Sequence, residues 1–198
     1  MVVAMGLLGR QEELAFLGAA ARSAQDGDAG MVVVGGEAGI GKTCLLDHQA
    51  ARAAQAGWRV LRGACVELGA EGLPLAAITT VLRELARDPG PDRLTRLLPA
   101  ARGLLELLPE YGPAARTRRE DGGPRLFELA ELFAALLRRL AEERPVLLVV
   151  DDLHWADRTT RELLGYLART LRPARVLLLA AYRDDDLDRA HPLPPYLA

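Results

Sequence analysis

The sequence predicts a three-layer α/β fold in which a parallel sheet is flanked by helices on both faces. Short, uninterrupted apolar runs such as Val146–Val150 have the length and composition of strands that are buried on both sides. Amphipathic helical patterns separate these runs, and such alternation is typical of parallel sheets. The 198 residues, 50% hydrophobic and 26% charged, are enough for one such domain with a full core. We therefore expect a single domain over 1–198.

The first part of the chain contains two expected strands, each preceded by a helix. The loop 26–30 and Gly57 supply the chain breaks, because glycine ends helices and forms turns. The expected elements are a helix over 11–25, a strand over 31–34, a helix over 43–56 and a strand over 58–66.

The middle segment, 67–124, is expected to be a helical insertion interrupted by proline and glycine. Helical periodicity covers 75–87 and 93–108, with breaks at Pro99, Pro109 and 89–91. The charged run 116–121 is most simply a solvated loop, and contact with a phosphate or a partner is the alternative.

The last part of the chain returns to alternating helices and strands. An amphipathic helix is expected over 126–143 and is stopped by Pro145. A strand over 146–150 follows, and Asp157 is expected to be the N-cap of a helix that ends near residue 171. The last expected strand covers 175–181.

A phosphate-binding motif follows the first strand. Lys42 is the only lysine among 25 lysine and arginine residues, and it lies in a Gly-x-x-x-x-Gly-Lys-Thr sequence. Glycines let backbone N–H groups turn inward around phosphate oxygens, and the following helix adds its positive end. Lys42 is expected to contact the β- and γ-phosphates, and the Thr43 hydroxyl to bind Mg²⁺. The alternative is a glycine-rich turn without a ligand. The nucleotide-binding residues expected here are Gly36, Glu37, Ala38, Gly39, Ile40, Gly41, Lys42, Thr43 and Cys44.

Two carboxylates end the strand over 146–150. Ligands of parallel sheets bind beyond the carboxyl ends of the strands, so Asp151 and Asp152 are expected beside the glycine loop. Asp151 is expected to hold Mg²⁺, and Asp152 to activate the attacking water. A turn or helix cap is the alternative. His154 is expected either to line the phosphate side of this site or to pack the loop against the core.

An arginine follows the last expected strand. Arg183 is expected at the same sheet edge, where its guanidinium can contact the γ-phosphate. A surface salt bridge to the acidic residues 184–186 is the alternative. The expected catalytic residues are therefore Lys42, Asp152 and Arg183.

Composition argues against several other classes of function. The net charge of −2 gives no overall attraction to nucleic acid. Two cysteines, Cys44 and Cys65, indicate no disulfide framework, and they and three histidines show no zinc spacing. No apolar run is long enough to cross a membrane, so we expect a cytoplasmic protein that does not bind membranes.

Four segments together resemble the AAA-type ATPase domain of STAND-class signal-transduction NTPases. They are 8–14, the loop 36–43, the segment 149–157 that ends in Leu-His-Trp-Ala-Asp, and 181–184. The nearest resemblance is to the N-terminal domain of large LuxR-family transcriptional regulators. It implies that Leu8, Gly9 and Arg10 border the adenine pocket. It also implies a switch between ADP-bound and ATP-bound forms, with slow hydrolysis and homo-oligomers in the ATP state.

Members of that family continue with a fifth core strand, a helical lid and a C-terminal DNA-binding domain. The present sequence contains no candidate recognition helix, so contact with DNA is expected only through a domain outside it. Three functional hypotheses follow: a slow Mg-dependent ATPase switch module, a regulatory module that binds ATP or ADP without hydrolysis, and a truncated remnant whose site does not close.

Overall fold

A four-stranded parallel sheet forms the centre of the computed structural model, which describes residues 10–67, 74–111 and 124–184. The strand order is β1-β4-β3-β2, and all three neighbouring pairs are parallel, as the sequence predicts. The strands are β1 (Gly30–Val34), β2 (Arg59–Ala64), β3 (Val146–Asp151) and β4 (Val176–Ala181).

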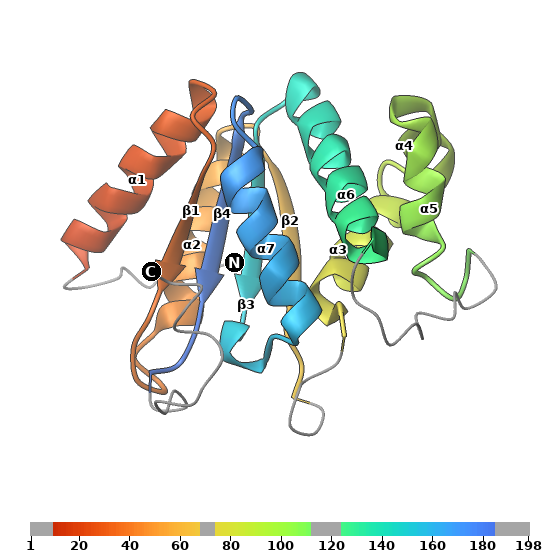
Figure 1. Cartoon of the computed structure of the whole chain (residues 1–198). Coiled ribbons are helices and arrows are strands. Elements are labelled where there is room, and N and C mark those ends of the chain that lie inside the picture. The colour runs from red at the N-terminus through yellow and green to blue at the C-terminus, as the bar shows by residue number, and fades with distance from the viewer. Residues whose placement is uncertain (1–9, 68–73, 112–123, 185–198) are drawn as a thin grey trace.

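Helices cover both faces of this sheet and complete the three layers (Figure 1). Buried residues of α1 and α2 pack on one face, whereas those of α6 and α7 pack on the other, together with α3 to α5. The helices are α1 (Gln11–Gln25), α2 (Lys42–Gln55), α3 (Ala76–Arg87), α4 (Pro91–Leu97), α5 (Arg102–Leu105), α6 (Pro124–Glu143) and α7 (Arg158–Thr170), with short 3-10 turns at η1 (Pro99–Ala101) and η2 (Leu153–Trp155).

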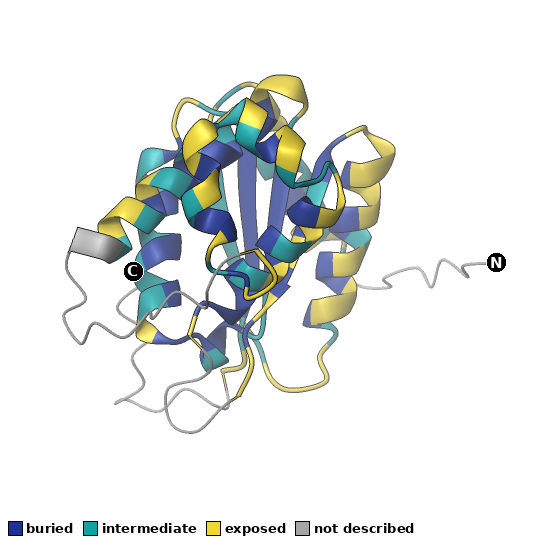
Figure 2. Ribbon diagram, turned by 90° about the vertical axis from the view of Figure 1, so that its right-hand side faces the viewer, coloured by how far each residue is buried: buried dark blue, intermediate teal, exposed yellow. Residues whose placement is uncertain are grey.

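The apolar strands are buried because both of their faces meet helices. Along β3, Leu147 and Val149 contact the α1–α2 layer, while Leu148 and Val150 contact the opposite layer, which follows the two-residue repeat of a strand. Figure 2 shows the same division, with buried strands in the interior and exposed residues on the outer sides of the helices. The apolar runs of β3 and β4 were therefore correct indicators of central, buried strands, whereas the run 31–34 forms the half-buried edge strand β1.

The segment 93–108 has helical periodicity but is interrupted at Pro99, as the sequence predicts. It is divided into α4, η1 and α5, with the break at Leu98 and Pro99. Leu98 has an extended backbone (φ −145°, ψ 102°), because a following proline disfavours helical geometry. Proline also lacks the N–H that would continue the hydrogen-bond ladder. The described part of the middle segment, 74–111, is otherwise mainly helical, with turns at 88–90 and 106–111, whereas the charged run 116–121 lies outside the described residues.

Asp157 is the N-cap of α7, as predicted, and it also contacts a second helix. Its carboxylate accepts hydrogen bonds from the backbone N–H of Thr159 (3.0 Å) and Thr160 (3.3 Å) and from the Thr160 hydroxyl. Its Oδ1 also accepts a hydrogen bond from the N–H of Leu75 (3.1 Å), the residue before α3. Asp157 is 5% exposed, so one buried carboxylate fixes the starts of α3 and α7.

Strand β1 is at one edge of the sheet and is less covered than the two central strands, β3 and β4. All five of its residues are half-buried, whereas all six residues of β4 are buried. A mainly apolar cavity of about 470 Å³ lies between β1 and α1, and Phe16 at its border is 63% exposed. Of the helices in the described ranges, none has the length and apolarity needed to cross a membrane.

Candidate functional site

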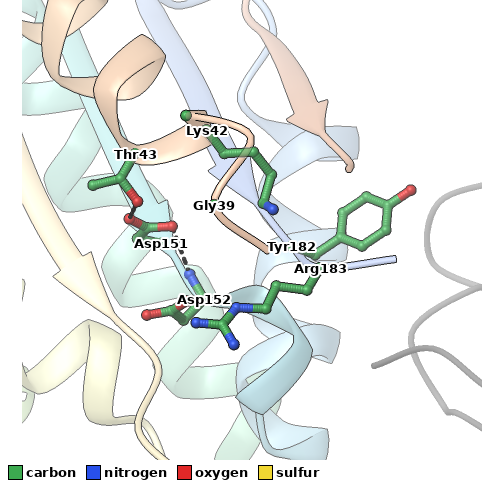
Figure 3. A pocket seen from close by; sticks show the side chains of 8 residues that line it. Gly39, Lys42, Thr43, Asp151, Asp152, Tyr182 and Arg183 are labelled. Atoms are coloured by element: carbon green, nitrogen blue, oxygen red, sulfur yellow. Dashed lines mark hydrogen bonds between the residues drawn. The ribbon is translucent and has the colours of Figure 1, made fainter. Parts of the chain in front are cut away.

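The carboxyl ends of three strands meet around one cavity of about 240 Å³. The loop after β1, the end of β3 and the residues after β4 all contribute to it, which is the usual ligand position in a parallel sheet. The cavity is lined by Gly39, Gly41, Lys42, Thr43, Asp151, Asp152, Tyr182 and Arg183. The structure thus brings together all of the predicted catalytic and metal-binding residues (Figure 3).

The glycine loop encloses the amino group of Lys42. Lys42 is 8% exposed, and its Nζ donates hydrogen bonds to the carbonyl oxygens of Gly36 (2.6 Å) and Glu37 (2.7 Å). Gly39 and Gly41 have φ values of +76° and +91°, which residues with a side chain rarely adopt. A Cβ at either position would meet no atom within 4 Å, so the loop leaves open space above its backbone. A concave loop that surrounds one cation suits phosphate oxygens.

Thr43 and Asp151 place two hard oxygen ligands next to each other. The Thr43 hydroxyl donates a 2.9 Å hydrogen bond to Oδ2 of Asp151, and the backbone N–H of Asp152 donates a 2.9 Å bond to Oδ1 (Figure 3). Mg²⁺ is usually held by one or two such groups together with phosphate oxygens and water. The hydroxyl and carboxylate therefore fit a magnesium ion that a bound nucleotide would share.

Asp152 has an unusual backbone at the end of β3. Its φ of 54° and ψ of 42° are left-handed, a conformation that is uncommon outside glycine. This turn begins η2 and leaves the Asp152 side chain 45% exposed at the cavity. A carboxylate in this position can accept a proton from water inside the cavity.

His154 packs into the core and does not line the cavity. Its side chain is 1% exposed, and its ring centroid lies 5.0 Å from that of Trp155. Its Nε2 is 3.9 Å from Oδ1 of Asp152. Of the two expected positions for His154, the structure therefore favours packing behind the loop, with the imidazole beside the carboxylate that faces the cavity.

Arg183 and Tyr182 leave the end of β4 in different directions. The exposed Arg183 side chain runs toward the side of the cavity that holds Asp152, whereas the Tyr182 ring points away from it (Figure 3). Burial raises the pKa of the Tyr182 phenol, and the neighbouring Asp184 carboxylate raises it further by its charge and a hydrogen bond. Sequence reasoning identified Arg183 and considered Asp184 only as a possible salt-bridge partner, and it gave no role to Tyr182.

The other predicted nucleotide-binding residues are placed less directly. Leu8 and Gly9 lie outside the described residues. Arg10 donates a hydrogen bond to the carbonyl of Ile40, so it contacts the glycine loop itself. Cys44 is exposed on α2, directly after Thr43. Of the remaining predicted residues, Gly36 and Glu37 act through their carbonyls, and neither Ala38 nor Ile40 lines the cavity.

Comparison with protein families matches residues 6–179 to the AAA ATPase domain model. An uncharacterized protein of Rhizobium meliloti (strain 1021) is 27% identical over 215 residues, which cover 94% of this chain. The same alignment covers 20% of that relative, so the chain spans about a fifth of its length.

Two solved structures match this chain at low sequence identity and low structural similarity. The structure of C. elegans PCH-2 is 15% identical, with a TM-score of 0.41, and covers 90% of this chain and 39% of that one. The structure of Drosophila ORC bound to GC-rich DNA and Cdc6 is 16% identical, with a TM-score of 0.39, and covers 98% of this chain and 56% of that one.

Proposed function

Because this chain belongs to the AAA ATPase domain family, we propose that it binds Mg-ATP or Mg-ADP at the cavity and hydrolyses ATP slowly. The observation that carries the proposal is the convergence of Lys42, Thr43, Asp151, Asp152 and Arg183 around one cavity at the carboxyl edge of the sheet. These groups come from three distant parts of the sequence. Their types are those that triphosphate hydrolysis needs at one place: cations for phosphate oxygens, hard ligands for a metal, and a carboxylate for water.

Each residue has a distinct proposed task. Lys42 exchanges its two loop carbonyls for phosphate oxygens, and Thr43 and Asp151 hold Mg²⁺. Bound Mg²⁺ neutralises charge that develops on the phosphate oxygens. The Asp152 carboxylate orients the attacking water and accepts its proton, and Arg183 contacts the γ-phosphate that is released.

The proposal includes a switch role in a LuxR-type transcriptional regulator. The segments 149–157 and 181–184 support it by their resemblance to such regulators. In this role the ATP form self-associates, hydrolysis resets it, and DNA is bound by a separate C-terminal domain. The half-buried β1 edge and its neighbouring cavity support the related proposal that another strand and a lid complete the core.

Calorimetric titration with Mg-ATP and Mg-ADP tests nucleotide binding directly. We expect saturable binding by the wild type and a loss of about 100-fold or more in Lys42→Ala, because hydrogen bonds to charged groups contribute about 1.5–3 kcal/mol each. Ser23→Ala on α1 is the control, since Ser23 lies away from the cavity. A folded wild type that binds neither nucleotide would refute the proposal.

Asp152→Asn separates hydrolysis from binding. If Asp152 is the base, turnover falls by about 10²–10⁴-fold while ATP affinity changes little. A binding module that does not hydrolyse is the second candidate, which the 45% exposure of Asp152 favours, because an open cavity does not exclude bulk water. Absent wild-type turnover with tight ATP binding would support this second candidate. Measurable turnover that is unchanged in Asp152→Asn would refute the base assignment.

A further inference from the structure

Residues beyond the end of β4 stay hydrogen-bonded to the start of the glycine loop. The regular pairing of β1 and β4 reaches Val34 and Ala181. Beyond it, the N–H of Tyr182 donates to the carbonyl of Val34 (3.0 Å), and the N–H of Asp184 donates to the carbonyl of Gly36 (3.2 Å). The backbone of Arg183 lies between these two bonds, so its position follows that of the loop.

The side chains of Tyr182 and Asp184 close over Gly35. A Cβ at Gly35 would lie 2.5 Å from both Cζ and Oη of Tyr182 and 2.9 Å from Oδ1 of Asp184. Real Cβ atoms do not approach other atoms this closely, so any side chain at position 35 would displace Tyr182 and Asp184 from their present positions. The Tyr182 hydroxyl is also hydrogen-bonded to the Asp184 carboxylate. Two side chains that flank Arg183 in sequence are thus tied to each other and to the loop.

The carbonyl oxygen of Gly36 joins this pair to the phosphate site. It accepts the 3.2 Å bond from the N–H of Asp184 and the 2.6 Å bond from Nζ of Lys42. A carbonyl oxygen has two lone pairs and can accept both bonds. The group that holds Lys42 therefore also holds the segment that carries Arg183.

We propose that Tyr182 and Asp184 are positioning residues that hold Arg183 in register with the glycine loop, so that Arg183 reaches the terminal phosphate of a nucleoside triphosphate. The inference rests on the proposed function, because it gives Arg183 a phosphate to contact. Side chains alternate along an extended segment, so Tyr182 and Asp184 lie over Gly35 while Arg183 extends along the cavity, which Tyr182 also borders. In this proposal the pair acts on the nucleotide through Arg183.

This role predicts an effect on ATP that ADP does not share. Lys42 and the loop backbone serve the phosphates of both nucleotides, whereas Arg183 serves only the γ-phosphate. Removing the hydrogen bond between Tyr182 and Asp184 should therefore weaken ATP binding more than ADP binding. A purely structural role would weaken both nucleotides equally, because it would act through the whole loop.

The test is a double-mutant cycle in the full chain, with Kd values for Mg-ATP and Mg-ADP from calorimetry. The variants are Tyr182→Phe, which removes only the hydroxyl, Arg183→Ala, and the two combined. Asp184→Asn is a second single variant, and Tyr166→Phe on α7, away from the cavity, is the matched control. We expect Arg183→Ala to weaken ATP by about tenfold, one charge-assisted hydrogen bond, and ADP by less than about twofold.

Tyr182→Phe and Asp184→Asn should each weaken ATP by about three- to tenfold with ADP nearly unchanged, and the combined variant should resemble Arg183→Ala alone. Equal losses for ATP and ADP, losses that multiply in the combined variant, or an Arg183→Ala variant with normal ATP affinity would each overturn the inference while leaving nucleotide binding intact. A wild type that binds neither nucleotide would overturn the proposed function and the inference together.

Discussion

Replacing Asp157 with alanine should destabilise the fold more than the loss of an ordinary helix cap. The cap of α7 alone contributes about 1 kcal/mol. The substitution also leaves the N–H of Leu75 and the hydroxyl of Thr160 without their carboxylate partner, and Thr160 is 1% exposed. Each buried polar group that loses its partner costs about 1–3 kcal/mol. We therefore expect the free energy of unfolding to fall by about 3 kcal/mol at least.

Urea unfolding followed by far-UV circular dichroism, without nucleotide, measures this loss as a shift of the midpoint at a constant slope. For a chain of this size the melting temperature should fall by about 6–12 °C. Asp157→Asn keeps one acceptor oxygen, so it should lose less than alanine. Asp26→Ala, at an exposed position after α1, should stay within about 0.5 kcal/mol of the wild type. A loss below about 1 kcal/mol in Asp157→Ala would refute the account of Asp157 as a link between α3 and α7.

Three further predictions concern the packing of Gly63, the reactivity of the two thiols and the pH dependence of stability. Gly63→Ala should lower the free energy of unfolding by about 1–3 kcal/mol in the same urea assay, because its Cβ would lie 2.4 Å from the backbone oxygen of Ala77. Gly30→Ala is the control and should be tolerated, since a Cβ there meets no atom within 4 Å. Equal effects of the two substitutions would contradict the close packing of α3 on β2. The exposed thiol of Cys44 should react quickly with a thiol reagent in the native state, whereas the buried thiol of Cys65 should react only after unfolding. The variants Cys44→Ser and Cys65→Ser assign each reaction to its cysteine, and fast native-state reaction in Cys44→Ser would contradict the burial of Cys65. Burial, and then the carboxylates near the site, raise the pKa of Cys65 to about 12. The folded state therefore keeps this proton while the unfolded state loses it above about pH 8.5. Stability should fall by up to about 1.4 kcal/mol per pH unit from there to about pH 12. Cys65→Ala should make stability fall less steeply with pH, and Cys44→Ala should leave the slope unchanged. An unchanged slope in Cys65→Ala would contradict the raised pKa of Cys65 as the cause.

Local sequence signals predicted the features that depend on neighbours in sequence. The apolar runs of β3 and β4 indicated buried parallel strands, and the spacing of Gly36, Gly41 and Lys42 indicated a loop between a strand and a helix. Asp157 was predicted as an N-cap because its type and its place before a helical pattern are sufficient for that inference. The common position of the two acidic residues and the loop followed from the parallel topology.

Features that depend on contacts between distant segments were not predictable in the same way. Nothing beside Gly35 in sequence indicates that Tyr182 will cover it, and nothing beside Asp157 indicates the contact with Leu75. The break at Pro99 was predicted from the proline itself, but the helical periodicity of 93–108 did not reveal that the last helix of this segment, α5, ends at Leu105. An aromatic residue next to the strand-end arginine, opposite a glycine that precedes the loop, is a signal that could have suggested the pairing.

The strand order also sets when the site can form during synthesis. In the described part of the chain, β1 has only β4 as a sheet neighbour, and Gly30 pairs with Leu177. A growing chain therefore carries the glycine loop and Lys42 without the strand that fixes them until β4 (Val176–Ala181) has been made. Contacts this distant in sequence form slowly, because a long loop must close first. A ribosome-bound chain that ends before β4 should not retain nucleotide, even though it already contains the entire glycine motif.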